Sequence, residues 1–272
     1  NTPYVVIQNV GAYIDVPRLL TSDQPVKTSA DAEAYLARLG AFAGALDGET
    51  GRLKAAAGEG LIAPAFLIDK ALPQMEATLA DARRGGSMAD SLAAKTREAG
   101  IAGDWRARAA AIAQGPVAAA LERQIAALRA QRSRATMDAG LWARPGGDEW
   151  YAWGLRASTT TRMTPDEIHR MGREELADLQ GQMDPILKRL GYTQGSVGDR
   201  MNALAKDPRF QFPNNDAGRA EIMAYIQTWL GKIRAEMPRA FRTLVRGNVE
   251  VKRLPLAEEP GAPAAYGGAG SI

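Results

Sequence analysis

The stretch TTTRMTPDEIHRMG (159–172) contains the only histidine of the chain, His169. A catalytic zinc ion takes about three protein ligands, which usually include two histidines four residues apart on one helix. Here the residue four positions after His169 is Arg173, and the nearest carboxylate on the same helical face is Asp166. The spacing therefore does not predict a zinc site. We expect His169 to be a structural residue that forms a hydrogen bond with a neighbouring loop.

Other residue patterns that could support chemistry are incomplete. The chain has no cysteine, which excludes disulfides, thiol catalysis and cysteine-bound zinc. It has no Gly-x-Ser-x-Gly motif, and the glycine-rich GGAGS (267–271) lacks the Lys-Ser/Thr of a phosphate-binding loop. No Asp-x-Asp-x-Asp-Gly loop is present, although a carboxylate-only site for a harder metal stays open. We therefore assign no catalytic and no metal-binding residue.

Composition limits the class of protein. The chain has 272 residues, of which 46% are hydrophobic and 24% charged, and its net charge is +3. The arginines are scattered along the predicted helices, which argues against nucleic-acid binding. No run of apolar residues is long enough to cross a membrane. The sequence begins with Asn1 rather than methionine, so we expect either that a targeting segment has been removed or that the chain starts inside a longer protein.

The pattern of apolar residues predicts a mainly α-helical protein, a multi-helix array with one or a few short β-strands near the C-terminal end. We expect helices over 29–57, 64–84, 87–99, 104–134, 149–160, 164–190, 196–207 and 217–241, and a strand over 249–255. Proline should kink or divide three of them, at Pro73, Pro116 and Pro238. We treat 1–272 as a single helical region with its best seam near 143–147, and 256–272 as a loop or ragged end.

The residues before His169 carry a strong helix start. Thr164 is suited to the N-cap, Pro165 to the first helical position, and Glu167 lies three residues after the cap. This is the arrangement of a capping box, in which the two side chains satisfy each other's backbone N–H groups. The sequence therefore predicts that the helix of His169 begins at Pro165.

Several long tracts together resemble a known bacterial family. They are PYVVIQNVGAY (3–13), QPVKTSADAEAYLARL (24–39), TTTRMTPDEIHRMGREEL (159–176), DPRFQFPNNDAGRA (207–220) and VEVKRLPLAEEPGAPAAY (249–266). The tracts are collinear and run almost from end to end. They are similar to domain-of-unknown-function family 885, whose members are generally described as zinc metallopeptidases.

The resemblance implies a mostly helical, zincin-like protein about twice as long as this chain. In the family a His-Glu-x-x-x-x-His-His segment binds zinc and follows the region matched here, and no part of 1–272 matches that segment. The chain is then the N-terminal half of a peptidase that hydrolyses peptide bonds with a zinc-activated water. Its partner is the C-terminal half, which carries the zinc, and the chain alone is expected to bind no cofactor and to be inactive.

The resemblance also suggests where substrate peptides bind and where the protein resides. Tyr266 precedes the expected active-site strand, and Tyr13 and His169 lie in matching tracts, so these three residues are candidates for lining a substrate cleft. Many relatives are exported, which implies a periplasmic or lipid-anchored envelope location. The alternative from a different functional class is a non-catalytic helical scaffold or interaction domain, which accounts for the missing zinc segment and the amphipathic helices.

Overall fold

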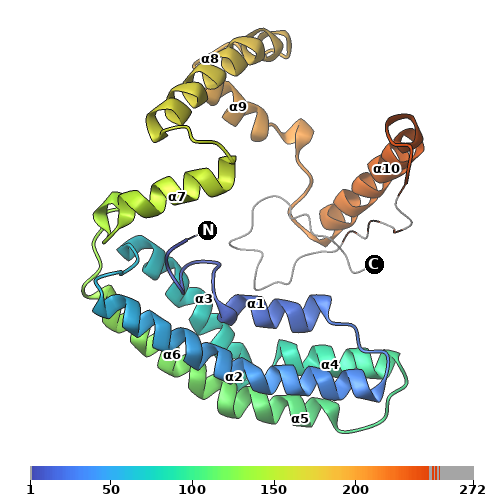
Figure 1. The fold of residues 1–272 in the computed structure, drawn as a ribbon. Helices are drawn as coiled ribbons and strands as arrows, with labels where there is room; N and C mark the ends of the chain where they lie inside the picture. The colour runs from blue at the N-terminus through green and yellow to red at the C-terminus, as the bar shows by residue number, and fades with distance from the viewer. Residues whose placement is uncertain (1, 245–246, 248, 250, 252–272) are drawn as a thin grey trace. The chain divides into compact units, whose positions relative to one another are not determined.

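The computed structural model describes residues 2–244, 247, 249 and 251, which fall into two units (Figure 1). The first is Asn1–Met163 and the second Thr164–Ile272. The seam predicted near 143–147 therefore lies inside the first unit. Arg144 holds this loop in place, because its Nε donates to the Tyr4 hydroxyl (3.0 Å) and its Nη2 to the Asp138 carbonyl (2.7 Å).

Helices make up almost all regular structure of the first unit, as predicted. They are α1 (Ala12–Arg18), α2 (Ser29–Gly58), α3 (Ala65–Arg83), α4 (Ser87–Glu98), α5 (Trp105–Ile112), α6 (Ala118–Arg132) and α7 (Gly147–Thr159). The only β pairing among the described residues is the isolated antiparallel bridge between Ile7 and Val10. The mainly α-helical class is confirmed.

The chain stays helical at Pro73 and at Pro116. Helix α3 runs through Pro73 without division. A π-helical turn at Ala113–Val117 contains Pro116 and joins α5 directly to α6. Proline lacks an N–H and its ring crowds the carbonyl of the preceding turn, and a wider turn relieves that crowding. The sequence predicted an interruption at Pro116, and the α-helix is interrupted there by a π-helical turn that keeps the chain helical.

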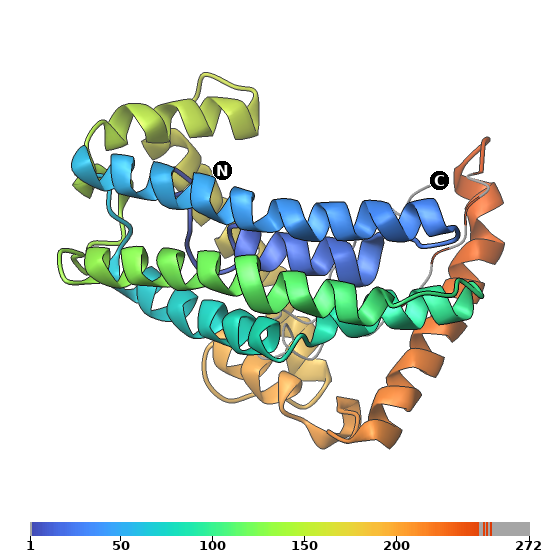
Figure 2. The same cartoon turned by 90° about the horizontal axis from the view of Figure 1, so that it is seen from below.

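The first unit is organised around α2 and α6, which lie side by side (Figure 2). The apolar stripe predicted for α2 is buried, including Tyr35, Phe42 and Leu46. Two buried glutamines of α6 reach across to α2, where the Gln124 amide donates to the Leu46 carbonyl (3.3 Å) and the Gln131 amide to the Leu53 carbonyl (2.8 Å). From the first pair to the second, the position moves forward by seven residues in both helices, so α2 and α6 run in the same direction.

Helix α3 packs on the other side of α6 and runs antiparallel to it. Arg129 pairs with Glu76 at 2.6 Å, and Arg132 holds Asp69 through two hydrogen bonds of 2.6 and 3.0 Å. The hydrogen bonds from Arg132 lower the pKa of Asp69. These pairs are about half exposed, so each contributes little to stability, and the apolar contacts beneath them dominate.

The N-terminal segment is fastened to the core through Tyr13 of α1, a helix that the sequence analysis did not predict. The Tyr13 side chain is fully buried. Its hydroxyl lies 2.9 Å from the Ile7 carbonyl and 2.8 Å from Gln74 Oε1, and it accepts the Asn9 N–H at 3.1 Å. Burial raises the pKa of Tyr13, so the phenol stays protonated. The Tyr13 hydroxyl therefore connects the N-terminal loop that contains Ile7 and Asn9 to α3.

The second unit contains α8 (Pro165–Arg189), α9 (Val197–Ala205) and α10 (Asp216–Ala240). Helix α8 begins as predicted. The Glu167 N–H donates to the Thr164 hydroxyl (3.3 Å), and the Thr164 N–H donates to Glu167 Oε2 (2.7 Å). The break predicted at Pro238 is absent, because this proline lies in the last turn of α10. The strand predicted at 249–255 falls mostly, and the loop at 256–272 entirely, outside the described residues.

No helix in the described part of the chain is both long enough and apolar enough to span a membrane.

Tyr13→Phe should lower the free energy of unfolding by about 1–3 kcal/mol, since it leaves buried polar groups without their partner. Chemical denaturation of the 272-residue chain measures this change. Tyr151→Phe is the matched control, because Tyr151 is exposed and should change stability by less than about 0.5 kcal/mol. Equal effects of the two variants would contradict the role assigned to the Tyr13 hydroxyl.

Gly40→Ala and Gly44→Ala in α2 should each raise the free energy of unfolding by about 0.4–1 kcal/mol. Both glycines are helical and exposed, and a Cβ built at either position meets no atom within 4 Å. Thermal unfolding measures the change. Gly85→Ala is the opposite control, because Gly85 has φ +63° and its Cβ would lie 2.8 Å from the Ala110 Cβ. Destabilisation by both α2 substitutions would show that this face already has a close partner in solution.

Candidate functional site

The residues predicted to line a substrate cleft lie in different settings. Tyr13 is a core residue whose side chain does not reach the surface, so it does not line a cleft in this structure. Tyr266 lies outside the described residues. His169 is exposed on α8, and no hydrogen bond joins it to a described residue, so the predicted bond to a neighbouring loop does not form. On an exposed helix in its second turn, the imidazole is simply solvated.

The described residues do not fit a zinc site. Among them, no group of three or more histidine, cysteine, aspartate or glutamate side chains is arranged to hold a metal ion. The immediate helical neighbours of His169 include Arg170 and Arg173, whose positive charges would oppose a bound cation.

One polar cluster in the second unit is built from Tyr192, Asp207 and Arg209. Arg209 donates to Asp207 from Nη2 (2.6 Å) and Nε (3.0 Å), and Tyr192 also donates to Asp207. Hydrogen bonds from Arg209 hold the pKa of Asp207 far below its usual range, and Asp207 in turn raises the pKa of Tyr192. Both groups therefore keep one protonation state near neutral pH. The cluster clamps a loop and is unsuited to acid–base catalysis.

A second polar cluster joins α8 to α9. The buried Arg200 donates from Nη2 to Asp184 (2.6 Å), and Lys188 donates to the other oxygen of the same carboxylate (2.7 Å). Hydrogen bonds from Lys188 and Arg200 lower the pKa of Asp184. Arg200 is buried although Asp184 is only partly so, and loss of Asp184 would therefore leave a buried charge without compensation. The cluster fixes the α8–α9 hairpin and leaves the rest of α8 uncovered.

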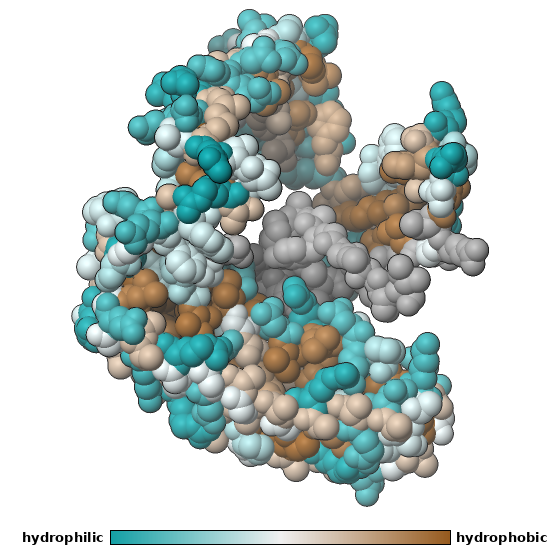
Figure 3. Space-filling view, viewed as in Figure 1, coloured by the Kyte–Doolittle hydropathy of each residue, from teal (hydrophilic) through white to brown (hydrophobic). Residues whose placement is uncertain are grey.

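The distinctive feature of the second unit is exposed apolar surface (Figure 3). We define the α8 apolar face as Leu176, Leu179, Met183, Ile186 and Leu190. Four of these side chains, all except Met183, are between 45% and 55% exposed. Helix α9 buries the neighbouring Leu187. Apolar residues at this helical spacing are typical of a face that packs on another element.

Helix α10 carries a second exposed apolar stripe. Tyr225, Trp229 and Ile233 are all exposed along it, and the Phe212 ring lies 5.8 Å from that of Tyr225. The 25-residue helix makes no extensive contact with another helix in the described part of the chain. An isolated helix in water is only marginally stable. Both long helices of this unit thus have apolar faces that the described residues of the unit do not bury.

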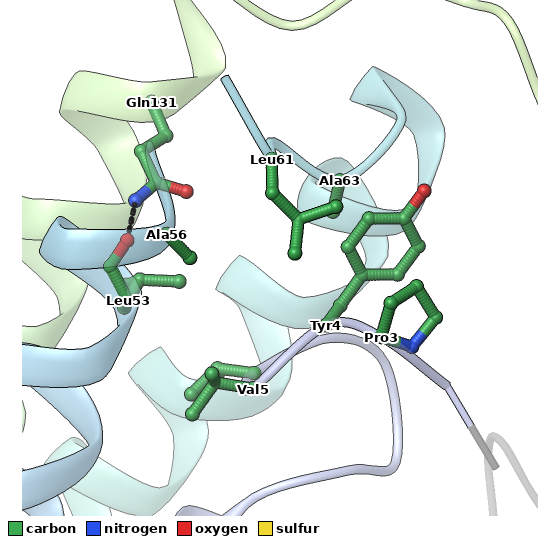
Figure 4. A pocket seen from close by; sticks show the side chains of 9 residues that line it. Pro3, Tyr4, Val5, Leu53, Ala56, Leu61, Ala63 and Gln131 are labelled. Atoms are coloured by element: carbon green, nitrogen blue, oxygen red, sulfur yellow. Dashed lines mark hydrogen bonds between the residues drawn. The ribbon is translucent and has the colours of Figure 1, made fainter. Parts of the chain in front are cut away.

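Cavities in the first unit are small or shallow. Figure 4 shows one between the N-terminal segment and α2, with room for a single water (about 10 Å³) beside the hydrogen bond from Gln131 to Leu53. An adjoining cavity of about 110 Å³ is bordered by Trp150, at the start of a row of exposed aromatic residues on α7. A groove of about 560 Å³ between α2 and α6 is open to solvent, and its Arg123 and Asp47 are paired with each other. None resembles an enclosed substrate pocket.

Comparisons with known proteins agree with the helical architecture. The crystal structure described as that of a putative lipoprotein from Colwellia psychrerythraea matches with a TM-score of 0.89 and 28% sequence identity. The match covers 96% of this chain and 46% of that one, so this chain spans less than half the length of the relative. A comparison with curated proteins found no match.

A family model matches residues 3–272, nearly the whole sequence. The chain therefore belongs to the family described as bacterial protein of unknown function (DUF885).

Proposed function

We propose that this chain is the N-terminal helical part of a longer zinc-dependent metallopeptidase, whose zinc site lies outside the described residues. The reaction class comes from the resemblance described in the sequence analysis, to a family whose members are generally described as zinc metallopeptidases. The solved relative supports the length, since the matched region is 46% of that chain. The site itself argues for the division of labour, because the described residues supply no set of metal ligands.

The observation that carries the proposal is the exposed apolar surface of the second unit. Only Leu187, Arg200 and Gly218 are buried among its described residues, whereas the first unit buries a continuous core. Burying a leucine or isoleucine side chain contributes about 1.5–3 kcal/mol. The α8 and α10 faces together therefore offer a large gain to a polypeptide segment that covers them. In the proposed peptidase that segment is the C-terminal half.

Each unit then has its own task. The first unit, with its buried core and paired α2–α6 rod, serves as a rigid framework. The second unit presents the surfaces on which the zinc-bearing half docks. This chain contributes no group to the bond-breaking chemistry from its described residues, and it helps to form the walls around a peptide substrate.

We further propose that the parent protein resides in the bacterial envelope, in the periplasm or lipid-anchored. The solved relative is described as a putative lipoprotein.

The alternative is a non-catalytic interaction domain. Exposed Trp150, Tyr151 and Trp153 of α7 favour it, since exposed aromatic residues are enriched where proteins bind each other. The two proposals predict different zinc content and different peptidase activity for the full-length protein.

The natural full-length polypeptide, purified from its source, should contain about one zinc per chain and hydrolyse peptides. The 272-residue chain should do neither. Elemental analysis after dialysis and a peptide-mixture digestion followed by mass spectrometry measure the two properties. Chelation followed by zinc addition is the control for dependence on the metal.

Stoichiometric zinc in the 272-residue chain would overturn the assignment of the metal to the other half. A full-length polypeptide that is zinc-free and inactive would favour the interaction domain.

A further inference from the structure

We propose that the α8 apolar face docks one amphipathic helix supplied by the remainder of the full-length polypeptide, packed along α8 in the manner of a coiled coil. This inference rests on the proposed function only in requiring a longer polypeptide. It requires neither zinc nor peptidase activity.

The spacing of the face specifies the shape of what covers it. Leu176, Leu179, Met183, Ile186 and Leu190 follow one another at intervals of three, four, three and four residues. This is the a/d pattern of a heptad repeat, whose side chains fit between those of one facing helix that crosses at about 20°. Helices also pack on sheets, but a stripe restricted to a and d positions is the narrow seam typical of packing against a single helix. The face therefore selects a helix as its occupant.

The described residues of its own unit leave the face open along its length. At the C-terminal end of α8, where α9 contacts it, Leu187 of α8 and Arg200 of α9 are buried, yet Ile186 and Leu190 remain about half exposed. Leu176 and Leu179 lie farther toward the N-terminus and are exposed as well. The docked helix would thus extend the small interface that α9 begins.

Some charged and polar residues of α8 pair with one another on its polar face, and others lie at the two edges of the apolar face, unpaired among the described residues. On the polar face Arg170 lies 3.9 Å from Glu174, and Gln182 donates to Asp178 at 2.7 Å. Arg173 and Glu175 flank the apolar face on opposite edges, and neither forms an ion pair with a described residue. Edge charges of a heptad pair with opposite charges on the partner. We expect an acidic residue of the docked helix near Arg173 and a basic one near Glu175.

The length of the solved relative identifies the source of this helix. More than half of that chain lies outside the region matched here, and the matched region reproduces this fold at a TM-score of 0.89. A segment of the same polypeptide reaches the face at a high effective concentration. It therefore has the advantage over a second copy of the chain, which must associate from solution.

The absence of cysteine from the chain allows a direct test with Leu179→Cys on the face and Glu174→Cys on the polar side. Both variants are made in the 272-residue chain and in the natural full-length polypeptide, and maleimide labelling at each position is followed by peptide mass spectrometry. In the 272-residue chain the two thiols should react at rates within about threefold of each other. In the full-length polypeptide Cys at 179 should react at least about tenfold more slowly than Cys at 174, because labelling then requires the docked helix to open.

Leu176→Cys and Leu190→Cys extend the test along the helix and guard against local misfolding of one variant. Protection at 176, 179 and 190, with none at 174, is the result expected for a docked helix. Equal labelling of 179 and 174 in the full-length polypeptide would overturn the proposal. Protection that appears in the 272-residue chain and grows with its concentration would assign the face to a second copy instead.

The two proposals fail separately in these experiments. Protection at 179 in a full-length polypeptide without zinc or peptidase activity would uphold the docked helix and reject the peptidase. Zinc-dependent activity without protection at 179 would uphold the peptidase and reject the docked helix.

Discussion

The register of α2 against α6 is the constraint on which the first unit depends. Gln124 and Gln131 are buried and donate to α2 carbonyls seven residues apart. A slip by a single residue would leave both buried amides without acceptors, at a cost of about 1–3 kcal/mol each. Apolar contacts supply most of the stability of this pair, but they tolerate such slips better. The polar pairs fix the register, and with it the surface of α6 on which α3 packs.

The second unit shows what happens to amphipathic helices without such a partner. Helix α8 has a complete capping box at Thr164 and a partly buried ion pair between Asp184 and Arg200 of α9, so its ends are well determined. These local interactions define where the helix begins and how it meets α9. They bury almost no apolar area. Both units form helices, but among the described residues only the first unit buries the apolar faces of its helices. The exposed surfaces of the second unit are therefore the ones that we expect to bind a partner.

Local signals in the sequence were sufficient for most of the fold. The capping box at Thr164 and the apolar stripe through Tyr35 and Leu46 each depend on residues close together in the chain, and both formed as predicted. At Pro116 the sequence predicted an interruption but not its form, a π-helical turn that keeps the chain helical. Tyr13 is buried, and the hydrogen bond from its hydroxyl to Gln74, sixty-one residues away, could not be predicted from local sequence. Periodicity identifies an apolar face, but whether anything covers that face depends on tertiary contacts.

The same distinction explains why the sequence located no active site. Catalysis needs several polar groups directed at one reacting atom. In the two polar clusters of the second unit, the charged groups instead bond to one another. Asp207 is held ionised by Arg209, and Asp184 is shared between Lys188 and Arg200. Each carboxylate is saturated with donors and has little capacity left for a metal or a substrate. Carboxylates whose hydrogen-bonding capacity is used to hold a hairpin together can help to shape a cleft but cannot act as catalytic groups. In the proposed peptidase, the catalytic groups would therefore come from other parts of the polypeptide.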